Sequence, residues 1–519
     1  MNRHTPTFHT RRTSAISLLI AVVLAIIGAP AAALADTRPD SLETLFPDVT
    51  PEAIPDTLAP LDIDAPRKIK RNYWRPIAET FGLNLGIWAF NHFAANQDYA
   101  EISGRSIRHN IKAGFRWDND NLTTNCFYHP YNGSLYYNAA RANGFSYWGS
   151  ALFAIGGSAM WEVFMESELP STNDIIATPV GGVAVGEPLY RAADAVTDDT
   201  STGWERAGRE IAGFILSPAR GFNRIVTGQA WRRSATRGRE FGQPLFTFSA
   251  GIGGKMLLMP YGGKNHTAAG GTIVLTGTYG DLFAETSEKP FDYFTIGAEL
   301  QAISGQPVLT ALNIRGRLWN LPLHHNATEK LNFGIYQDYD FLEADTVESI
   351  GHAPFRLATP AAFGANISWR HEQPSRLRLD VTAGANGVVL GGVISDHYAS
   401  EARNYNFGSG FALKGEAALT LGKERFRLGV SHSFYRLFSW KGYKRGINPS
   451  EHVYQELNAQ GDKSVASFGI TEVRADLRVW RHLYATFILS RYDRVTNYRD
   501  FPTVDTSSTA LRLLLTYHL

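Results

Sequence analysis

Five residues in the middle of the chain have side chains that could transfer protons or bind a metal ion. They are His129, Glu162, Glu166, Asp174 and Glu187. On a helix, two residues four positions apart, as the first two glutamates are, share a face. A histidine with several carboxylates has the chemistry of a metal site or of acid–base work. The alternative, which we favour from sequence, is structural: Asn138, Arg141, Glu162, Glu166 and Asp174 pair across helix ends, because buried polar groups need partners.

No motif connects these residues to a particular reaction. Their spacing matches no metal site such as His-Glu-x-x-His, so we predict neither a metal ion nor a cofactor. No glycine-rich loop for nucleotide phosphates is present. The His-x-Ser spacing that would place a histidine and a serine on one face of a strand does not occur. Ser431-His432-Ser433 comes closest, but adjacent strand residues face opposite sides. A pair formed between two strands stays open.

The five residues lie in a segment, residues 73–240, that is mostly helical in pattern. Phe145–Trp161 runs 17 residues without a charge and is rich in glycine and alanine, which let helices approach closely. Thr178-Pro179 and Gly181-Gly182 interrupt a second apolar stretch, and Glu205–Phe214 indicates another helix. The pattern predicts two to four helices, packed on one another or on the rest of the chain.

Local signals suggest how these helices begin. His129-Pro130 with Gly133 is typical of a loop entering a helix, with Ser134 as its N-cap. Pro170–Asp174 is typical of a turn and cap before the next helix. Ile107–Trp117 alternates briefly between apolar and polar residues, which suggests a short strand.

From residue 244 to the end, the apolar residues recur every second position. Leu377, Leu379, Val381 and Ala383, for example, alternate with charged or polar residues. Most such segments approach the ~9–11 residues with which a tilted strand crosses a bilayer. About 12 are present, near 245–257, 270–280, 291–303, 308–319, 331–340, 360–370, 376–389, 408–421, 424–435, 467–480, 482–493 and 508–519. We therefore predict a mainly β fold, an antiparallel transmembrane β-barrel of about 12 strands over 244–519, preceded by a small α-helical segment.

The first residues have the pattern of a secretory signal. Three arginines precede the apolar run Ala15–Ala29, and Ala33 and Ala35 are the small residues that a signal peptidase requires. We expect residues 1–35 to be removed. Residues 36–72 contain six prolines and many acids, which favours a proline-rich acidic linker in the periplasm.

Composition limits the remaining classes. Removing three arginines leaves 47 basic and 49 acidic residues, a net charge of −2 that gives no reason to expect nucleic acid as a partner. Cys126 is the single cysteine, so the chain has no disulfide within itself. After the signal, no apolar stretch reaches the ~20 residues of a membrane-spanning helix.

Two stretches resemble known families. Leu511, Leu513, Leu515, Tyr517 and Leu519 alternate as in the last strand of outer-membrane barrels, which the barrel-assembly machinery recognises, although the final residue is Leu instead of an aromatic. Residues 101–230 resemble a family of uncharacterised bacterial envelope proteins that carry a domain of unknown function. The resemblance rests on His129–Arg141, Gly157–Glu162, Pro170–Asp174, Thr178–Gly182 and Gly186-Glu187. It implies a barrel-linked envelope protein and assigns no reaction.

Together these features indicate a protein of the bacterial outer membrane in contact with its lipid, with an unknown small-molecule ligand, if any. We expect a structural or binding role in the envelope without an assignable reaction. One alternative is a gated channel or transporter with a helical plug, and a second is an enzyme that modifies lipid or lipopolysaccharide. Twelve strands are fewer than the ~16–18 of open porins, so we expect a lumen blocked by side chains or by part of 73–240.

Overall fold

The computed structural model describes residues 62–519, except 287–288, 345–352, 375 and 399–401. The predicted signal peptide with Ala33 and Ala35, and the predicted linker up to residue 61, lie outside the described residues. The chain forms two compact units. One contains the described residues up to Ile69, which are 62–69, together with Tyr190–Pro244, and the other contains the described residues of Lys70–Leu189 and Leu245–Leu519.

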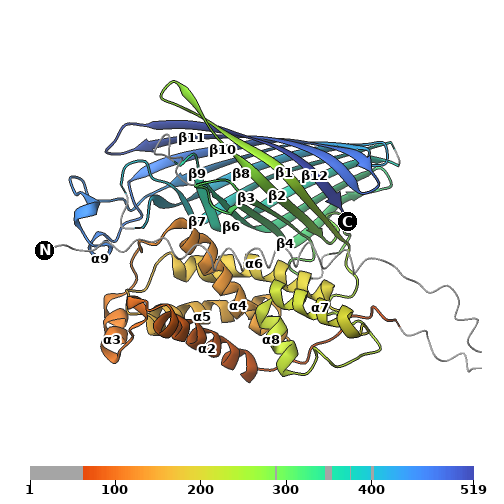
Figure 1. Cartoon of the computed structure of the whole chain (residues 1–519), viewed down its shortest axis with the longest axis horizontal. Helices are drawn as coiled ribbons and strands as arrows, with labels where there is room; N and C mark the ends of the chain where they lie inside the picture. The colour runs from red at the N-terminus through yellow and green to blue at the C-terminus, as the bar shows by residue number, and fades with distance from the viewer. Residues whose placement is uncertain (1–61, 287–288, 345–352, 375, 399–401) are drawn as a thin grey trace, which may run out of the picture. The chain divides into compact units, whose positions relative to one another are not determined.

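The second half of the chain is a closed barrel of twelve antiparallel strands in which β1 pairs with β12 (Figure 1). The strands are β1 Phe246–Tyr261, β2 Lys264–Tyr279, β3 Phe294–Ala302, β4 Leu309–His325, β5 Glu329–Glu343, β6 Arg356–Gln373, β7 Leu377–Ile394, β8 Tyr405–Leu421, β9 Phe426–Phe438, β10 Ser464–Trp480, β11 Leu483–Tyr498 and β12 Val504–His518. Each predicted segment coincides with one of them, so the predicted fold class is confirmed. Gly262 and Gly263, with φ of 59° and 75°, form the tight turn between β1 and β2 that only a left-handed backbone allows.

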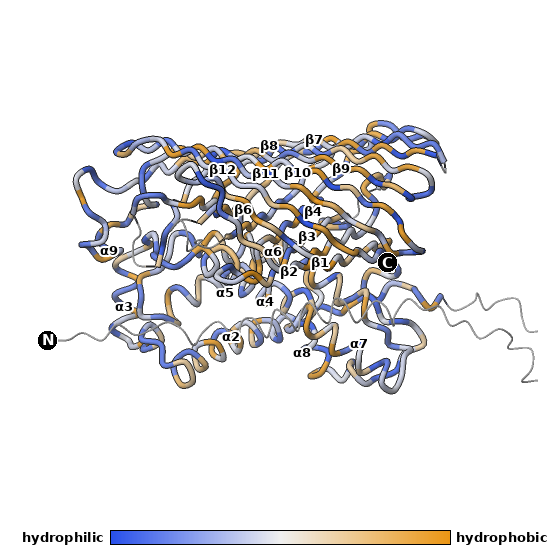
Figure 2. The backbone as a smooth tube through the Cα atoms, turned by 45° about the horizontal axis from the view of Figure 1, so that its top comes forward, coloured by the Kyte–Doolittle hydropathy of each residue, from blue (hydrophilic) through white to orange (hydrophobic). Residues whose placement is uncertain are grey.

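Side chains along the strands alternate between the lumen and the outside. On β12, Arg512 and Thr516 are buried in the barrel, whereas Leu513, Leu515 and Tyr517 are exposed on its outer surface. The hydropathy of the strands alternates accordingly along the barrel wall (Figure 2). This is the pattern of a barrel whose outer surface faces an apolar medium.

The lumen is crossed by side chains. Lys255 Nζ lies 2.7 Å from Glu299 Oε1, and Arg512 Nη2 lies 2.8 Å from Glu299 Oε2. The ring of Phe355, just before β6, stacks on Tyr492 of β11 with 4.2 Å between centroids. Because β6 and β11 are five places apart around the closed sheet, this contact bridges the lumen. A cavity of ≈ 250 Å³ remains, lined by both acidic and basic residues.

The unit that contains the barrel also contains most of the helices. They are α2 Trp74–Ala89, α3 Gly104–Ala113, α4 His129–Ala142, α5 Tyr147–Met160 and the first part of α6 Asp174–Val196, with π-helical turns at Phe90–Ala94, Thr124–Tyr128 and Trp161–Met165. No helix in the described part of the chain is both long and apolar enough to cross a membrane. With α7 Gly203–Leu216 and α8 Pro218–Val226 of the other unit, the described residues between 73 and 240 form seven α-helices, more than predicted.

Three local predictions were wrong. Ile107–Trp117 is not a strand, because α3 covers most of it and ends before Gly114, whose φ is 69°. His129 begins α4 directly after a π-helical turn, so Ser134 lies inside the helix and is not its cap. Pro179, Gly181 and Gly182 lie within α6. These glycines do not end the helix. They let α6 pack closely against α4, because a Cβ on Gly182 would lie 2.5 Å from the backbone carbon of Gly133 on α4.

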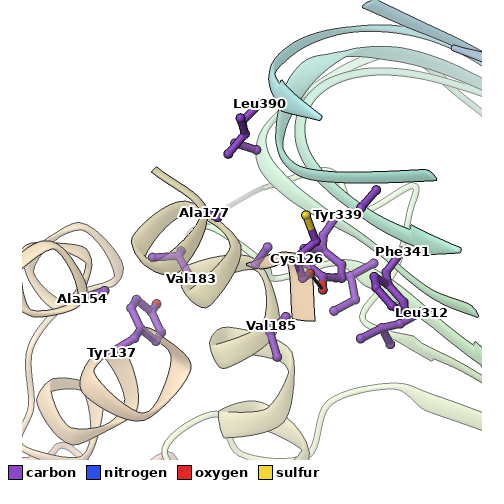
Figure 3. Close-up of a cluster of buried hydrophobic side chains, with 14 of the residues drawn as sticks. Cys126, Tyr137, Ala154, Ala177, Val183, Val185, Leu312, Tyr339, Phe341 and Leu390 are labelled. Atoms are coloured by element: carbon purple, nitrogen blue, oxygen red, sulfur yellow. Dashed lines mark hydrogen bonds between the residues drawn. The ribbon is translucent and has the colours of Figure 1, made fainter. Parts of the chain in front are cut away.

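The helices of this unit pack on the outer wall of the barrel. Asp338 and Asp340 of β5 face the lumen, where both bind Lys414 Nζ. The intervening Tyr339 therefore faces outwards, and its hydroxyl donates to the backbone oxygen of Cys126. Figure 3 shows Tyr339, Phe341 and Leu312 of the wall beside Cys126 and Val185 of the helical segment.

The same contact continues along β5. Gln337 accepts a hydrogen bond of 2.7 Å from the Tyr147 hydroxyl and donates one of 2.8 Å to the Val180 oxygen. Thr123 donates to the Glu343 carboxylate. Outward-facing residues of one strand thus bind π-helical turns and helices from three parts of the segment.

The other unit is held by buried ion pairs between α6, α7 and α8. Arg220 Nη2 lies 2.8 Å from Asp194 Oδ1, and Arg224 Nη2 lies 2.7 Å from both Asp199 and Glu210. The predicted helix at Glu205–Phe214 lies within α7.

Candidate functional site

The structure brings three of the five sequence-predicted residues together. One ligand-type atom from each of His129, Glu162 and Asp174 lies within 4.8 Å of the corresponding atoms of the other two. His129 Nε2 is 3.8 Å from Asp174 Oδ2. Asp118 joins them through hydrogen bonds described below. These four residues are called the histidine–carboxylate cluster.

Three members of the cluster, His129, Glu162 and Asp174, come from the start or end of a helical element. His129 is the first residue of α4 and follows a π-helical turn. Glu162 lies in the π-helical turn that extends α5, and Asp174 is the first residue of α6. Because π-helical turns are rare and often occur at functional sites, two of them beside one cluster are notable.

The turn before α6 holds the carboxylates in place. The backbone N–H of Ser171 donates to Glu162 Oε2 at 2.7 Å, while its hydroxyl accepts from the N–H of Asp174 at 3.1 Å. Ser171 is therefore the cap of α6, as the Pro170–Asp174 pattern predicted. Asn173 Nδ2 donates to Asp174 Oδ1 at 3.0 Å.

Asp118 enters the cluster from an extended segment. The backbones of Arg116 and Ser171 form a parallel β-bridge, which brings Asp118 beside the start of α6. Its carboxylate accepts from Asn125 Nδ2 at 2.7 Å and from the Ser171 hydroxyl at 3.3 Å. The Arg403 guanidinium contacts the backbone oxygen of Asp118 at 2.5 Å.

The two remaining predicted residues have other surroundings. Glu187 is fully buried and pairs with Arg141, whose Nε and Nη2 lie 2.8 and 3.2 Å from its carboxylate oxygens, and the Tyr137 hydroxyl donates to it at 2.7 Å. Arg141 is thus committed to Glu187 and not, as the structural interpretation supposed, to the acids of the cluster. Glu166 follows the π-helical turn that contains Glu162 and is close enough to hydrogen-bond it.

Burial and mutual repulsion disfavour negative charge in the cluster. Burial raises the pKa of Glu162 to about 8. Burial, followed by repulsion from Asp118 and Glu162, raises the pKa of Asp174 well above its usual range. Burial also lowers the pKa of His129, which favours the neutral imidazole. Among the described residues, none of the cluster's carboxylates forms an ion pair with a lysine or arginine. A neutral imidazole and several carboxylates without a cation can share protons or bind a metal ion.

Asp118 and Asn125 were missed from sequence. Asp118 lies in the polar run 118–121, which has no motif spacing to the other acids. Only the pairing of its backbone with the turn before α6 brings it to the cluster. The acidic run was the one available signal, and it is equally typical of a solvated loop.

Comparison with known proteins identifies one domain family in the chain. Residues 114–219 match a family described as a domain of unknown function (DUF3943). The chain contains this domain. The match lies within residues 101–230, where the motifs had indicated it, and covers His129, Glu162 and Asp174. No curated protein matches the chain.

Several solved structures resemble the barrel. The NanC porin is 6% identical and covers 52% of this chain and 100% of its own, with a TM-score of 0.26. The toluene transporter TodX of Pseudomonas putida is 9% identical, with 54% and 90% covered and a TM-score of 0.22. The translocator domain of the autotransporter NalP from Neisseria meningitidis is 10% identical, with 52% and 88% covered and a TM-score of 0.19. Similarity this low concerns the barrel fold alone.

Proposed function

We propose that this protein is an outer-membrane β-barrel that anchors a helical module, residues 73–189, on its outer wall and has a structural or binding role in the bacterial envelope. The observation that carries the proposal is that the two faces of β5 have different partners. Asp338 and Asp340 bind Lys414 in the lumen, whereas Tyr339 and its outward-facing neighbours bind the module. A module held on the outward face supports anchoring over plugging.

The ends of the barrel support its orientation in the outer membrane. Residues 326–328, 422–425 and 481–482 are short turns, and they lie at the end where β1 begins and β12 ends. The long connection 439–463 lies at the opposite end. Outer-membrane barrels have short turns in the periplasm and longer loops outside. We therefore propose that the N-terminal linker is periplasmic and that the last strand is recognised by the barrel-assembly machinery.

The lumen supports a barrel that is closed at rest. The Phe355–Tyr492 stack crosses it, and paired charges such as Lys255 and Glu299 project into it, so the side chains leave a cavity and not a wide pore. We expect the full-length protein in planar bilayers to show no steady single-channel current. The double variant Phe355→Ala/Tyr492→Ala should conduct, which would show that the silent protein had inserted.

The channel alternative has a specific observation in its favour, because the cavity is lined by charges of both signs, among them Arg315, Lys414 and Glu472. A stable open level from the unaltered protein would favour a gated channel and refute the closed barrel. The enzyme alternative would depend on the histidine–carboxylate cluster.

The surface of the module supports contact with lipid. The α2 residues Trp74 and Phe81 and the α5 residues Trp148 and Leu152 are exposed by 81, 52, 60 and 67%, respectively. Large exposed apolar surfaces mark interaction sites, and the module packs on a wall whose remaining outer surface is also apolar.

Lipid contact can be measured with a fluorophore on one introduced cysteine. In a Cys126→Ser background, bimane on Leu152→Cys should be quenched by brominated lipid. Bimane on Arg108→Cys, an exposed position of the basic helix α3, is the matched control and should be quenched far less. Equal quenching at the two positions would refute a lipid-facing module.

A further inference from the structure

We propose that His129, Glu162 and Asp174 bind one divalent transition-metal ion, with Zn²⁺ as the best match to their ligand atoms. All three residues lie in the module, so binding of the ion does not depend on whether the barrel is closed.

The spacing of the three side chains fits a shared ion. Zinc lies about 2.0–2.2 Å from histidine nitrogen and carboxylate oxygen, so two ligands of one tetrahedral ion are roughly 3.4 Å apart. The three ligand atoms lie within 4.8 Å of one another, and His129 Nε2 is 3.8 Å from Asp174 Oδ2. That last distance is too long for a hydrogen bond between the two groups. Small movements towards a common centre would complete the site.

The charges of the surroundings also favour a cation. Several other buried acids of this unit have a basic partner: Glu187 has Arg141, Glu299 has Lys255 and Arg512, and Asp338 has Lys414. In the described residues, the carboxylates of the cluster have no such partner. Burying acids without a cation is costly unless they take up protons or a metal ion. A divalent ion would replace the missing basic side chain.

The groups around the three residues are those of a supported metal site. Ser171 N and Asn173 Nδ2 each bind one carboxylate oxygen, of Glu162 and Asp174 respectively, and thereby orient the two acids. Asn125 is fully buried and donates to Asp118, while its own Oδ1 has no hydrogen-bond partner. Asp118 and Asn125 thus add further oxygen atoms beside the three proposed ligands.

The type of ion follows from the ligands. One imidazole nitrogen with carboxylate oxygens suits Zn²⁺ and its neighbours in the first transition row, whereas Mg²⁺ and Ca²⁺ are bound by oxygen alone. Three protein ligands leave a fourth position for water or a ligand, as in catalytic zinc sites. The His129 side chain keeps 16% of its surface exposed, so the site is not fully enclosed.

Zinc binding can be measured on the full-length protein in detergent after chelator treatment. Titrating Zn²⁺ against a chromophoric chelator should show one tight site per chain, and Zn²⁺ should raise the thermal midpoint of the module. Both His129→Ala and the near-isosteric Glu162→Gln should weaken binding at least tenfold. His109→Ala, an exposed histidine on α3, and Cys126→Ser, which removes the buried thiol, should leave binding unchanged.

Two sets of results would overturn the proposal. One is a folded protein without a tight zinc site, or with equal affinity after both ligand substitutions. The other is loss of binding in Cys126→Ser or His109→Ala, which would assign the zinc to different ligands. Folding of each variant is checked by the heat-dependent gel mobility of the barrel. If His129→Ala fails this check, Glu162→Gln decides the outcome.

Discussion

The buried pair of Arg141 and Glu187 allows a quantitative test of how the module is held together. Replacing Arg141 with methionine keeps most of the side-chain volume and removes a positive charge that pairs with Glu187 through two contacts, at 2.8 and 3.2 Å. Glu187 is 0% exposed, so its carboxylate would be left buried with the Tyr137 hydroxyl. Breaking a buried ion pair in this way costs about 3–5 kcal/mol.

Removing both charges should cost much less. Arg141→Met/Glu187→Leu removes both charges of this pair, so neither partner is left buried without the other, and we expect a loss of no more than about 2 kcal/mol. Hydrogen exchange of the α4 and α6 amides gives the free energy of opening of the module without unfolding the barrel. The control is Arg209→Met, which breaks a 2.9 Å pair with Glu205, an acid whose side chain is 55% exposed. It should cost less than about 1 kcal/mol.

The single and double variants together distinguish an unpaired buried charge on Glu187 from a simple loss of packing. If Arg141→Met and the double variant lose the same amount, the loss comes from packing and the argument from a stranded charge is refuted. A loss in Arg141→Met as small as in the surface control would refute it as well, because it would mean that water reaches Glu187.

Three further predictions concern the module. Gly133→Ala places a Cβ 1.8 Å from the Thr178 oxygen and should release the module to protease while the barrel stays folded, whereas Gly156→Ala, which meets nothing within 4 Å, should not. In metal-free protein, the folded state holds a proton on Glu162, whose pKa burial raises to about 8. The stability that this proton contributes is complete below about pH 4 and is lost as the pH rises to 8, by up to about 5 kcal/mol. Thermal midpoints should therefore fall more steeply over this range in wild type than in Glu162→Gln, where Asp174, whose pKa is also raised, still titrates. Cys126 is buried and its pKa is raised by burial, so a thiol reagent should react only when the module opens, and fast labelling of the folded protein would contradict the packing on β5.

The barrel could be predicted from sequence because its signal is local. Alternation such as Leu513, Leu515 and Tyr517 depends only on which face of a strand meets an apolar medium. The packing of helices on the wall could not be predicted in the same way. Tyr339 and Phe341 face helices and not lipid, yet both surroundings select the same apolar side chains.

The candidate site shows the same division between local and distant information. His129, Glu162 and Asp174 were identified by residue type, and Ser171 by its capping pattern. Their assembly was not predictable, because π-helical turns set the direction of His129 and Glu162 and no sequence periodicity marks such turns. Proline and glycine within α6 also misled the prediction, since Gly182 serves close contact with α4 and not chain reversal.

Closure of the barrel by its first and last strands determines the order in which this protein can mature. The module precedes the barrel in the chain, but the wall that covers its apolar side is built from β2 to β8, and the barrel is closed only when β12 has paired with β1. If the chain is exported as we propose, the module therefore emerges before its docking surface exists. It must be shielded by a chaperone or remain unfolded until the barrel is inserted, so a defect in the last strand would be seen first as degradation of residues far upstream.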